Sequence, residues 1–292
     1  MRRAAKRLKA LGFVPHIDES ALLKHQRFAG NDEQRLATLH RVAEAAPDVA
    51  LATRGGYGLT RLLDRIDWKL LASSIERGTA WVGYSDLTAL QLGALAHKAA
   101  GPAEVDEGHT AGFWAGPMAC GDFGHPDLPD GGDDVTQEIF VEAVSGFLEA
   151  VGFRTENGFD GLQVKGRLWG GNLSVIQSML GTPHFPKIKK GVLFLEDVNE
   201  HPYRIERGLL QLQQAGILDA QSAIVLGTFT GFAKSPLDRG YNLKSVIAYL
   251  RSLTSTPILT GLPFGHVPTK LCLPLGRSAT LTVQGRETFL KW

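Results

Sequence analysis

The sequence predicts an α/β protein with a parallel sheet in its N-terminal half and a mixed, β-rich domain in its C-terminal half. Short apolar runs alternate with amphipathic helical stretches, and glycine-rich turns follow several of these runs. Alternation of this kind is typical of parallel sheets that helices cover on both faces. The length of 292 residues is enough for two compact domains.

The N-terminal half shows the alternation clearly. The first predicted helix carries leucines on one face and has Gly12 at its C-cap, and Asn31 is a typical N-cap for the second. Apolar runs of about four residues predict the buried strands. In chain order we expect a helix over residues 1–12, an edge strand over 13–17, a helix over 31–45, a strand over 49–52, a helix over 60–66, a strand over 80–83 and a helix over 87–97.

The C-terminal half resumes the pattern after a looser stretch. Glycine, proline and aspartate are frequent between residues 119 and 161, which indicates a linker that contains one amphipathic helix over 135–151. We therefore divide the chain into an N-terminal domain (1–120), a linker region (121–164) and a C-terminal domain (165–292). Within the last we expect helices over 173–180, 205–215 and 246–253, strands over 191–196, 223–227 and 257–260, and a β-rich piece over 271–290.

The composition argues against several kinds of partner. Lys and Arg number 31 against 30 Asp and Glu, and the resulting net charge of +1 provides no field for nucleic acid or an acidic membrane surface. No apolar run approaches the roughly 18 residues of a spanning helix, and no apolar segment follows the basic start, so we expect a cytoplasmic protein. Cys120 and Cys272 lack metal-ligand spacing, and no histidine pair forms a metal motif, so no metal site is expected.

A serine stands where a predicted buried strand turns into a helix. At this position Ser85 can expose its hydroxyl above the sheet, beside a helix N-terminus that favours negative charge. The second glycine of the G-x-S-x-G pattern is absent, because Leu87 stands there. Ser85 is therefore either a nucleophile or only the N-cap of the following helix.

The turn Arg54–Gly58 contains three glycines. Glycine permits a positive φ and a close approach of the backbone to a ligand, so free N–H groups here could form an oxyanion hole; a plain tight turn is the alternative. The turn has neither the G-x-G-x-x-G pattern nor a P-loop lysine, which argues against nucleotide binding.

An acid and a base stand at predicted element ends in the C-terminal half. Glu196 closes an apolar strand, where a carboxylate is costly to bury without a partner, and a neutral imidazole such as that of His266 would supply an N–H donor. A lone histidine after a glycine is also common as a structural residue. With Ser85, the two fit the roles of nucleophile, orienting carboxylate and general base.

Five motifs together resemble those of one family, the serine LD-carboxypeptidases of peptidoglycan recycling. The resemblance runs from the first helix to the C-terminus, and the motifs occur in the family's order. It implies a flavodoxin-like N-terminal domain, a β-rich C-terminal domain of the swivelling β/α/β type, a site at their interface and a homodimer. The motifs are Arg54–Gly58, Gly83–Ala89, Leu168–Leu173, Leu193–Arg204 and Gly261–His266.

The resemblance also assigns roles to individual residues. It makes Ser85 the nucleophile, His266 the general base and Glu196 the group that holds the imidazole tautomer. The backbone N–H groups of Gly55 and Asp86 would form the oxyanion hole. Because these residues come from both domains, we expect domain closure to assemble the site.

The implied reaction is hydrolysis of the amide bond between the L-centre of meso-diaminopimelate, or of lysine, and the terminal D-alanine of a muropeptide tetrapeptide. It proceeds through an acyl-enzyme and requires no metal or organic cofactor. Arg54 and Arg204 are candidates for binding the terminal carboxylate, and Asn172 for binding the peptide backbone. Each of the three could equally have a structural role.

Two alternatives and one departure accompany the resemblance. A peptide-antibiotic immunity hydrolase of the same family would cleave a peptidyl-nucleotide with the same triad, and a flavodoxin-like binding module would have no catalysis. Glu196 and His266, at their motif positions, argue against the second. Family members ordinarily begin with a strand before the first helix, whereas this sequence starts inside that helix at Met1. We expect a misassigned start codon, and better folding and hydrolysis from a chain extended upstream.

Overall fold

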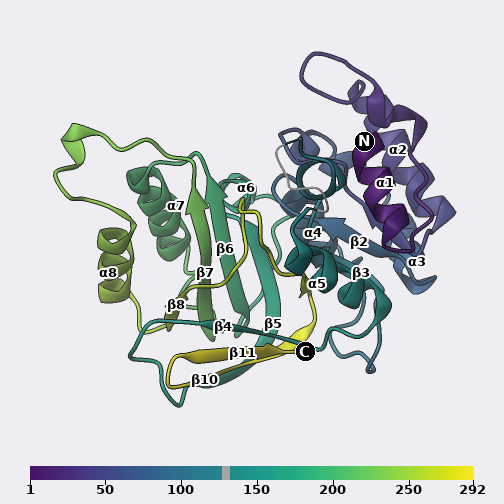
Figure 1. The fold of residues 1–292 in the computed structure, drawn as a ribbon. Helices are drawn as coiled ribbons and strands as arrows, with labels where there is room; N and C mark the ends of the chain where they lie inside the picture. Colours follow the sequence, from purple (N-terminus) through teal and green to yellow (C-terminus); the bar gives the residue numbers. More distant parts are fainter. Residues whose placement is uncertain (127–131) are drawn as a thin grey trace.

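The strands of the protein form two sheets that lie side by side (Figure 1). The computed structural model describes residues 1–126 and 132–292. In the smaller sheet, of order β1-β2-β3-β9, the first three strands run parallel and β9 runs antiparallel to β3. Its strands are β1 (Val49–Leu51), β2 (Ala80–Gly83), β3 (Gly112–Ala115) and β9 (Leu273–Leu275).

Helices cover both faces of the smaller sheet, as the parallel pattern predicts. Trp81 and Phe113 point to one face, into a core shared with α2, α3 and α4, while Val82 and Trp114 point to the other, into a core shared with α1 and α5. The alternation follows from the two-residue period of a strand. The helices are α1 (Arg2–Ala10), α2 (Asp32–Ala45), α3 (Trp68–Glu76), α4 (Leu87–Ala96) and α5 (Asp134–Ser145).

The larger sheet has seven strands in the order β4-β11-β10-β5-β6-β7-β8. From β5 to β8 neighbouring strands are parallel, and from β4 to β5 they are antiparallel, so the sheet is mixed as expected. Its strands are β4 (Ala150–Arg154), β5 (Gln163–Asn172), β6 (Val192–Val198), β7 (Ala223–Thr230), β8 (Ile258–Thr260), β10 (Ser278–Gln284) and β11 (Glu287–Lys291), and its helices are α6 (Leu173–Met179), α7 (Pro202–Gln214) and α8 (Leu243–Leu253).

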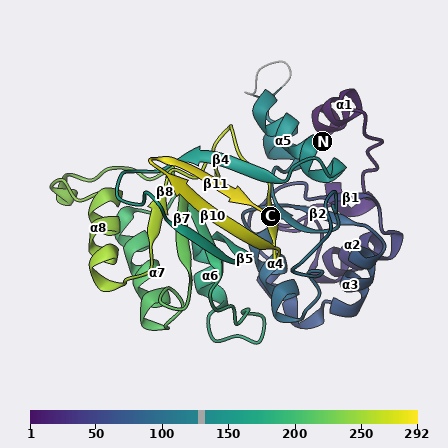
Figure 2. The same cartoon turned by 90° about the horizontal axis from the view of Figure 1, so that it is seen from below.

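Helix α4 joins the two halves. It is apolar all round, and eight of its residues are buried, because it contacts α6 and β5 of the second half while it packs on the smaller sheet. Figure 2 shows α4 and α6 at the junction of the two sheets, and the β10–β11 hairpin crossing toward it. The ends of β2 and β6 thus lie close to one another, which positions the site described below.

The structure corrects two of the expected elements and adds a strand. Residues 13–17 form no strand: Pro15 lacks an N–H donor, and Val14 is largely exposed. The helix expected over 60–66 is a pair of short 3-10 turns, because Asp67 caps a separate helix, α3, through the N–H groups of Lys69 and Leu70. Strand β3 was not expected from the sequence.

Residues 127–131 of the predicted linker region lie outside the described residues, and the rest of the region holds more regular structure than its composition indicates. It contains α5 and β4, and β4 pairs with β11 of the larger sheet. Helix α5 ends at Ser145, six residues before the expected end, since Gly146 adopts the left-handed C-cap conformation. The division at residues 120 and 164 therefore stays a prediction. No helix within residues 1–126 and 132–292 has the length and apolar character needed to cross a membrane.

Candidate active site

Ser85 lies on a sharp turn between β2 and α4. Its φ of +62° is in the left-handed region, which is unfavourable for a non-glycine residue and typical of a strained nucleophile elbow. Gly83 permits this turn, because a Cβ atom there would stand 2.8 Å from the Cβ of Ala52 and 2.7 Å from a methyl carbon of Leu87. The turn lifts the hydroxyl of Ser85 above the carboxyl end of β2.

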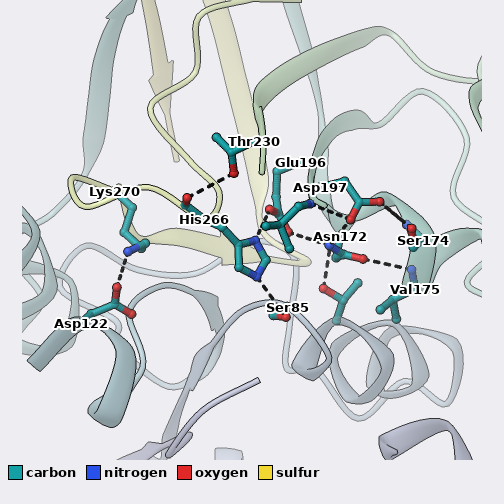
Figure 3. Close-up of polar contacts among 12 residues, drawn as sticks. Ser85, Asp122, Asn172, Ser174, Val175, Glu196, Asp197, Thr230, His266 and Lys270 are labelled. Carbon is teal, nitrogen blue, oxygen red and sulfur yellow. Dashed lines mark hydrogen bonds and ion pairs between the residues drawn. The ribbon is translucent and has the colours of Figure 1, made fainter. Parts of the chain in front are cut away.

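A continuous hydrogen-bonded chain joins Ser85 to His266 and Glu196 (Figure 3). Nε2 of His266 is 3.2 Å from Oγ of Ser85, and Nδ1 of His266 is 2.8 Å from Oε2 of Glu196. The Glu196 carboxylate is fully buried and accepts a hydrogen bond from Nδ1–H, so Nε2 is left as the acceptor for the serine hydroxyl. This is the proton arrangement that a general base requires.

The chain crosses from one sheet to the other. Ser85 follows β2 of the smaller sheet, Glu196 lies in β6, and His266 lies in the segment between β8 and β9. Gly265 is required beside His266, because a Cβ atom there would meet the carbonyl oxygen of Thr228 at 2.8 Å and the Cβ of Glu196 at 3.2 Å. The hydroxyl of Thr230 donates to the carbonyl oxygen of His266 at 3.3 Å and holds the segment from the other side.

The glycine-rich turn lies directly against the serine. A Cβ atom on Gly55 would stand 2.6 Å from Oγ of Ser85. In the part of the chain that the structure describes, the backbone N–H groups of Gly55 and Asp86 donate no hydrogen bond. The Asp86 carboxylate accepts the N–H of Leu59 at 2.9 Å and so ties the turn to the start of α4, while burial raises the pKa of that carboxyl group.

Asn172 supports the carboxylate of the chain. It is 5% exposed, its Nδ2 donates to Glu196 at 3.1 Å and to Asp197 at 2.9 Å, and its Oδ1 accepts the N–H of Val175. Its side-chain polar atoms are therefore engaged within the protein, which favours a structural role over contact with a peptide backbone. The sequence left both roles open. Asp197, which also accepts from Ser174 at 2.6 Å, was not singled out from the sequence.

The two arginine candidates differ in their surroundings. Arg54 is exposed beside Gly55, and no ion pair involving it occurs among the described residues. Arg204 lies in the first turn of α7, 3.6 Å from the Glu200 carboxylate, and the described contacts do not join it to the chain of Ser85, His266 and Glu196. Arg54 thus belongs to the glycine-rich turn that lies against Ser85, whereas the described contacts of Arg204 lie away from that turn.

An α/β scaffold with a serine on a strained elbow, hydrogen-bonded to an imidazole, is the arrangement of the serine hydrolases. The chain belongs to the LD-carboxypeptidase family: residues 1–101 match the family's N-terminal domain, and residues 165–281 match its C-terminal domain. It is thus a serine-type carboxypeptidase, and the predicted family and fold class are confirmed.

Several named proteins are similar to the chain over most of its length. The probable murein peptide carboxypeptidase of Bacillus subtilis (strain 168) is 28% identical and covers 97% of this chain and 84% of its own. The murein tetrapeptide carboxypeptidase of Pseudomonas aeruginosa is 30% identical, with 94% and 86% covered. The crystal structure of muramoyltetrapeptide carboxypeptidase from Oxalobacter formigenes is 38% identical, with a TM-score of 0.83 and 99% and 93% covered.

The microcin C7 self-immunity protein MccF shares the fold. Its wild-type structure has a TM-score of 0.82 and covers 100% of this chain and 90% of its own, at 22% identity. At that identity the likeness carries no argument about substrate.

Proposed function

We propose that the protein releases the terminal D-alanine of muropeptide tetrapeptides by hydrolysing the amide bond to the L-centre of meso-diaminopimelate or lysine. The observation that carries this proposal is the unbroken chain from Ser85 through His266 to the buried Glu196 in a member of the LD-carboxypeptidase family. Relatives named as murein peptide and murein tetrapeptide carboxypeptidases support the choice of substrate.

The proposed reaction begins with attack of Ser85 on the scissile carbonyl. Nε2 of His266, 3.2 Å from the hydroxyl, takes its proton, and Glu196 stabilises the imidazolium that forms. The C–N bond then breaks as His266 returns the proton to the amine of D-alanine, which leaves an ester on Ser85. A water molecule that gives a proton to His266 attacks this ester, and the tripeptide leaves as Ser85 recovers its proton.

The oxyanion of each tetrahedral intermediate would be bound by backbone N–H groups of the glycine-rich turn and of the residue after Ser85. The N–H groups of Gly55 and Asp86 donate to no group among the described residues, and Gly55 lies against Ser85. Two main-chain donors at this place can stabilise the charge that develops in the transition state by about 3 kcal/mol each.

Two exposed arginines suit a substrate rich in carboxylates. Arg54 begins the glycine-rich turn, and the guanidinium of Arg27 lies 5.8 Å from the ring centroid of Tyr57 within that turn. In the described part of the chain, no carboxylate pairs with either arginine. An extended tetrapeptide spans about 14 Å, so carboxylates beyond the scissile bond can reach this rim.

Removal of these arginines is expected to weaken substrate binding more than chemistry. Arg54→Ala and Arg27→Ala should each raise KM for the tetrapeptide about tenfold and change kcat less than threefold, because a charge-assisted hydrogen bond to carboxylate is lost. Arg65→Ala is a matched control, since Arg65 is exposed but pairs with Glu33. Steady-state kinetics decide: an unchanged KM in both variants would show that the carboxylates bind elsewhere.

The function is tested by the stereochemistry of the bond that is cut. A tetrapeptide ending in D-alanine should yield D-alanine and tripeptide, whereas the same peptide ending in L-alanine, and a pentapeptide ending in D-alanyl-D-alanine, should be cleaved at least a hundredfold more slowly. Chiral chromatography of the products measures this. Absence of D-alanine release, or equal release from the L-alanine peptide, would refute the proposal.

Three further expectations accompany this function. A cytoplasmic location fits the processing of recycled muropeptides, and a homodimer follows from the family resemblance; sedimentation would measure the second. Because the chain of Ser85, Glu196 and His266 spans both sheets, relative motion of the two halves would open and close the site.

A further inference from the structure

A buried lysine lies beside the candidate site but outside its hydrogen-bonded chain. The side chain of Lys270 is 1% exposed and forms an ion pair with Asp122, which is 7% exposed (Figure 3). Lys270 comes four residues after His266, and Asp122 lies in the segment that follows β3. The pair therefore ties the segment that carries the imidazole to the smaller sheet that carries Ser85.

Each member of the pair also contacts a neighbour of the reacting groups. Nζ of Lys270 lies 5.2 Å from the ring centroid of Tyr84, the residue before Ser85, and the Tyr84 ring packs edge-on against His266 with centroids 4.9 Å apart. Oδ2 of Asp122 accepts the N–H of Met118 at 2.6 Å. The methyl group of Met118 lies 3.6 Å from where a Cβ on Gly55 would stand.

Stability alone does not explain this pair. Desolvation of two charges offsets most of their attraction, and apolar residues of similar volume are often at least as stabilising as a buried ion pair. An unpaired Asp122 would be a second buried carboxylate near the imidazole, in addition to Glu196. Tyr84, whose ring packs against His266, is affected by both carboxylates. Burial raises the pKa of Tyr84 most, and the negative charges of Asp122 and Glu196 raise it further.

We propose that Lys270 is a positioning residue for the hydrolysis: it neutralises Asp122 and holds the Tyr84 ring against His266, so that the imidazole stays uncharged and can accept the serine proton. This inference rests on the proposed function. Among the described residues, Glu196 and Tyr84 are the ionisable groups in direct contact with His266, and Lys270 faces it across the Tyr84 ring. Asp133, which accepts from Thr269 at 2.7 Å, and the buried thiol of Cys272 face the pair from its other sides.

The test is the pH dependence of kcat/KM for D-alanine release in two single variants and their combination. Lys270→Met leaves a buried anion, which favours the imidazolium, so the acidic limb of the profile should move about half a pH unit to one unit higher. Asp122→Asn leaves a cation and should move the limb lower. The double variant should restore it to the wild-type position. At the pH optimum, kcat of Lys270→Met should fall about tenfold with KM nearly unchanged.

Arg251→Met and Glu156→Gln are matched controls. Arg251 on α8 forms an ion pair with Glu156, which follows β4, and the described contacts do not join this pair to the catalytic candidates. Neither should move the limb. If Lys270→Met fails to fold, the position of the acidic limb can still be compared between wild type, Asp122→Asn and the double variant. Limbs that stay in place, or that move in the same direction in both single variants, would overturn the inference. Failure of the wild type to release D-alanine would instead overturn the proposed function.

Discussion

Replacement of Ser85 by alanine is expected to lower kcat for D-alanine release by about 10⁴- to 10⁶-fold. The hydroxyl is the one group at the elbow within hydrogen-bond reach of Nε2 of His266, at 3.2 Å, so no neighbouring oxygen in the described chain can take its place. KM should change little, because the hydroxyl contributes to bond formation and not to the binding of the peptide. Steady-state and single-turnover assays over long incubation measure the loss.

A second serine provides the control for that variant. Ser178 lies on α6, and its hydroxyl donates to the carbonyl oxygen of Val175 at 2.7 Å. Ser178→Ala should keep wild-type kcat within a factor of two. Retention of more than one percent of wild-type activity by Ser85→Ala, after contaminating peptidases are excluded, would mean that Ser85 is not the nucleophile.

Glu196→Gln is expected to lower kcat by about 10³- to 10⁴-fold while the fold is kept. A neutral amide of the same shape no longer stabilises the imidazolium, and it can present an N–H₂ group toward Nδ1 of His266, which favours the wrong tautomer. Asn172, which donates to Glu196 at 3.1 Å, would have to reorient toward the new amide.

The matched variant for Glu196 is Asp197→Asn, the adjacent carboxylate on β6. Asp197 contacts Asn172 at 2.9 Å but not His266, so this change should cost at most tenfold in kcat. Thermal unfolding of both variants separates lost chemistry from lost structure. Equal losses in the two variants, or a Glu196→Gln enzyme within threefold of wild type, would contradict the orienting role.

Much of the site could be predicted because its residues stand at element ends with local signals. The strand before Ser85 and the glycines around it, the apolar run before Glu196 and the glycine before His266 are readable in the sequence. From these alone, a helix cap is the more common role for Ser85; the order of five motifs favours the nucleophile instead.

Other parts depend on long-range contacts that leave no local pattern. Lys270 and Asp122 are 148 residues apart in the chain and meet only when the segment before β9 returns to the smaller sheet. Strand β3 is four residues long and could not be distinguished from a buried loop. Asn172 looks like a polar residue in a glycine-rich turn until β5 and β6 place it against Glu196.

The central claim, covalent catalysis by Ser85, is tested most directly by peptide mapping of acid-quenched enzyme during turnover of a depsipeptide that ends in D-lactate. The ester acylates faster than the amide, so deacylation becomes limiting and the intermediate accumulates. A tripeptidyl ester is expected on the peptide that contains Ser85, and its added mass should be lost in step with tripeptide release. Steady release of D-lactate while the peptide that contains Ser85 stays unmodified would contradict covalent catalysis by Ser85.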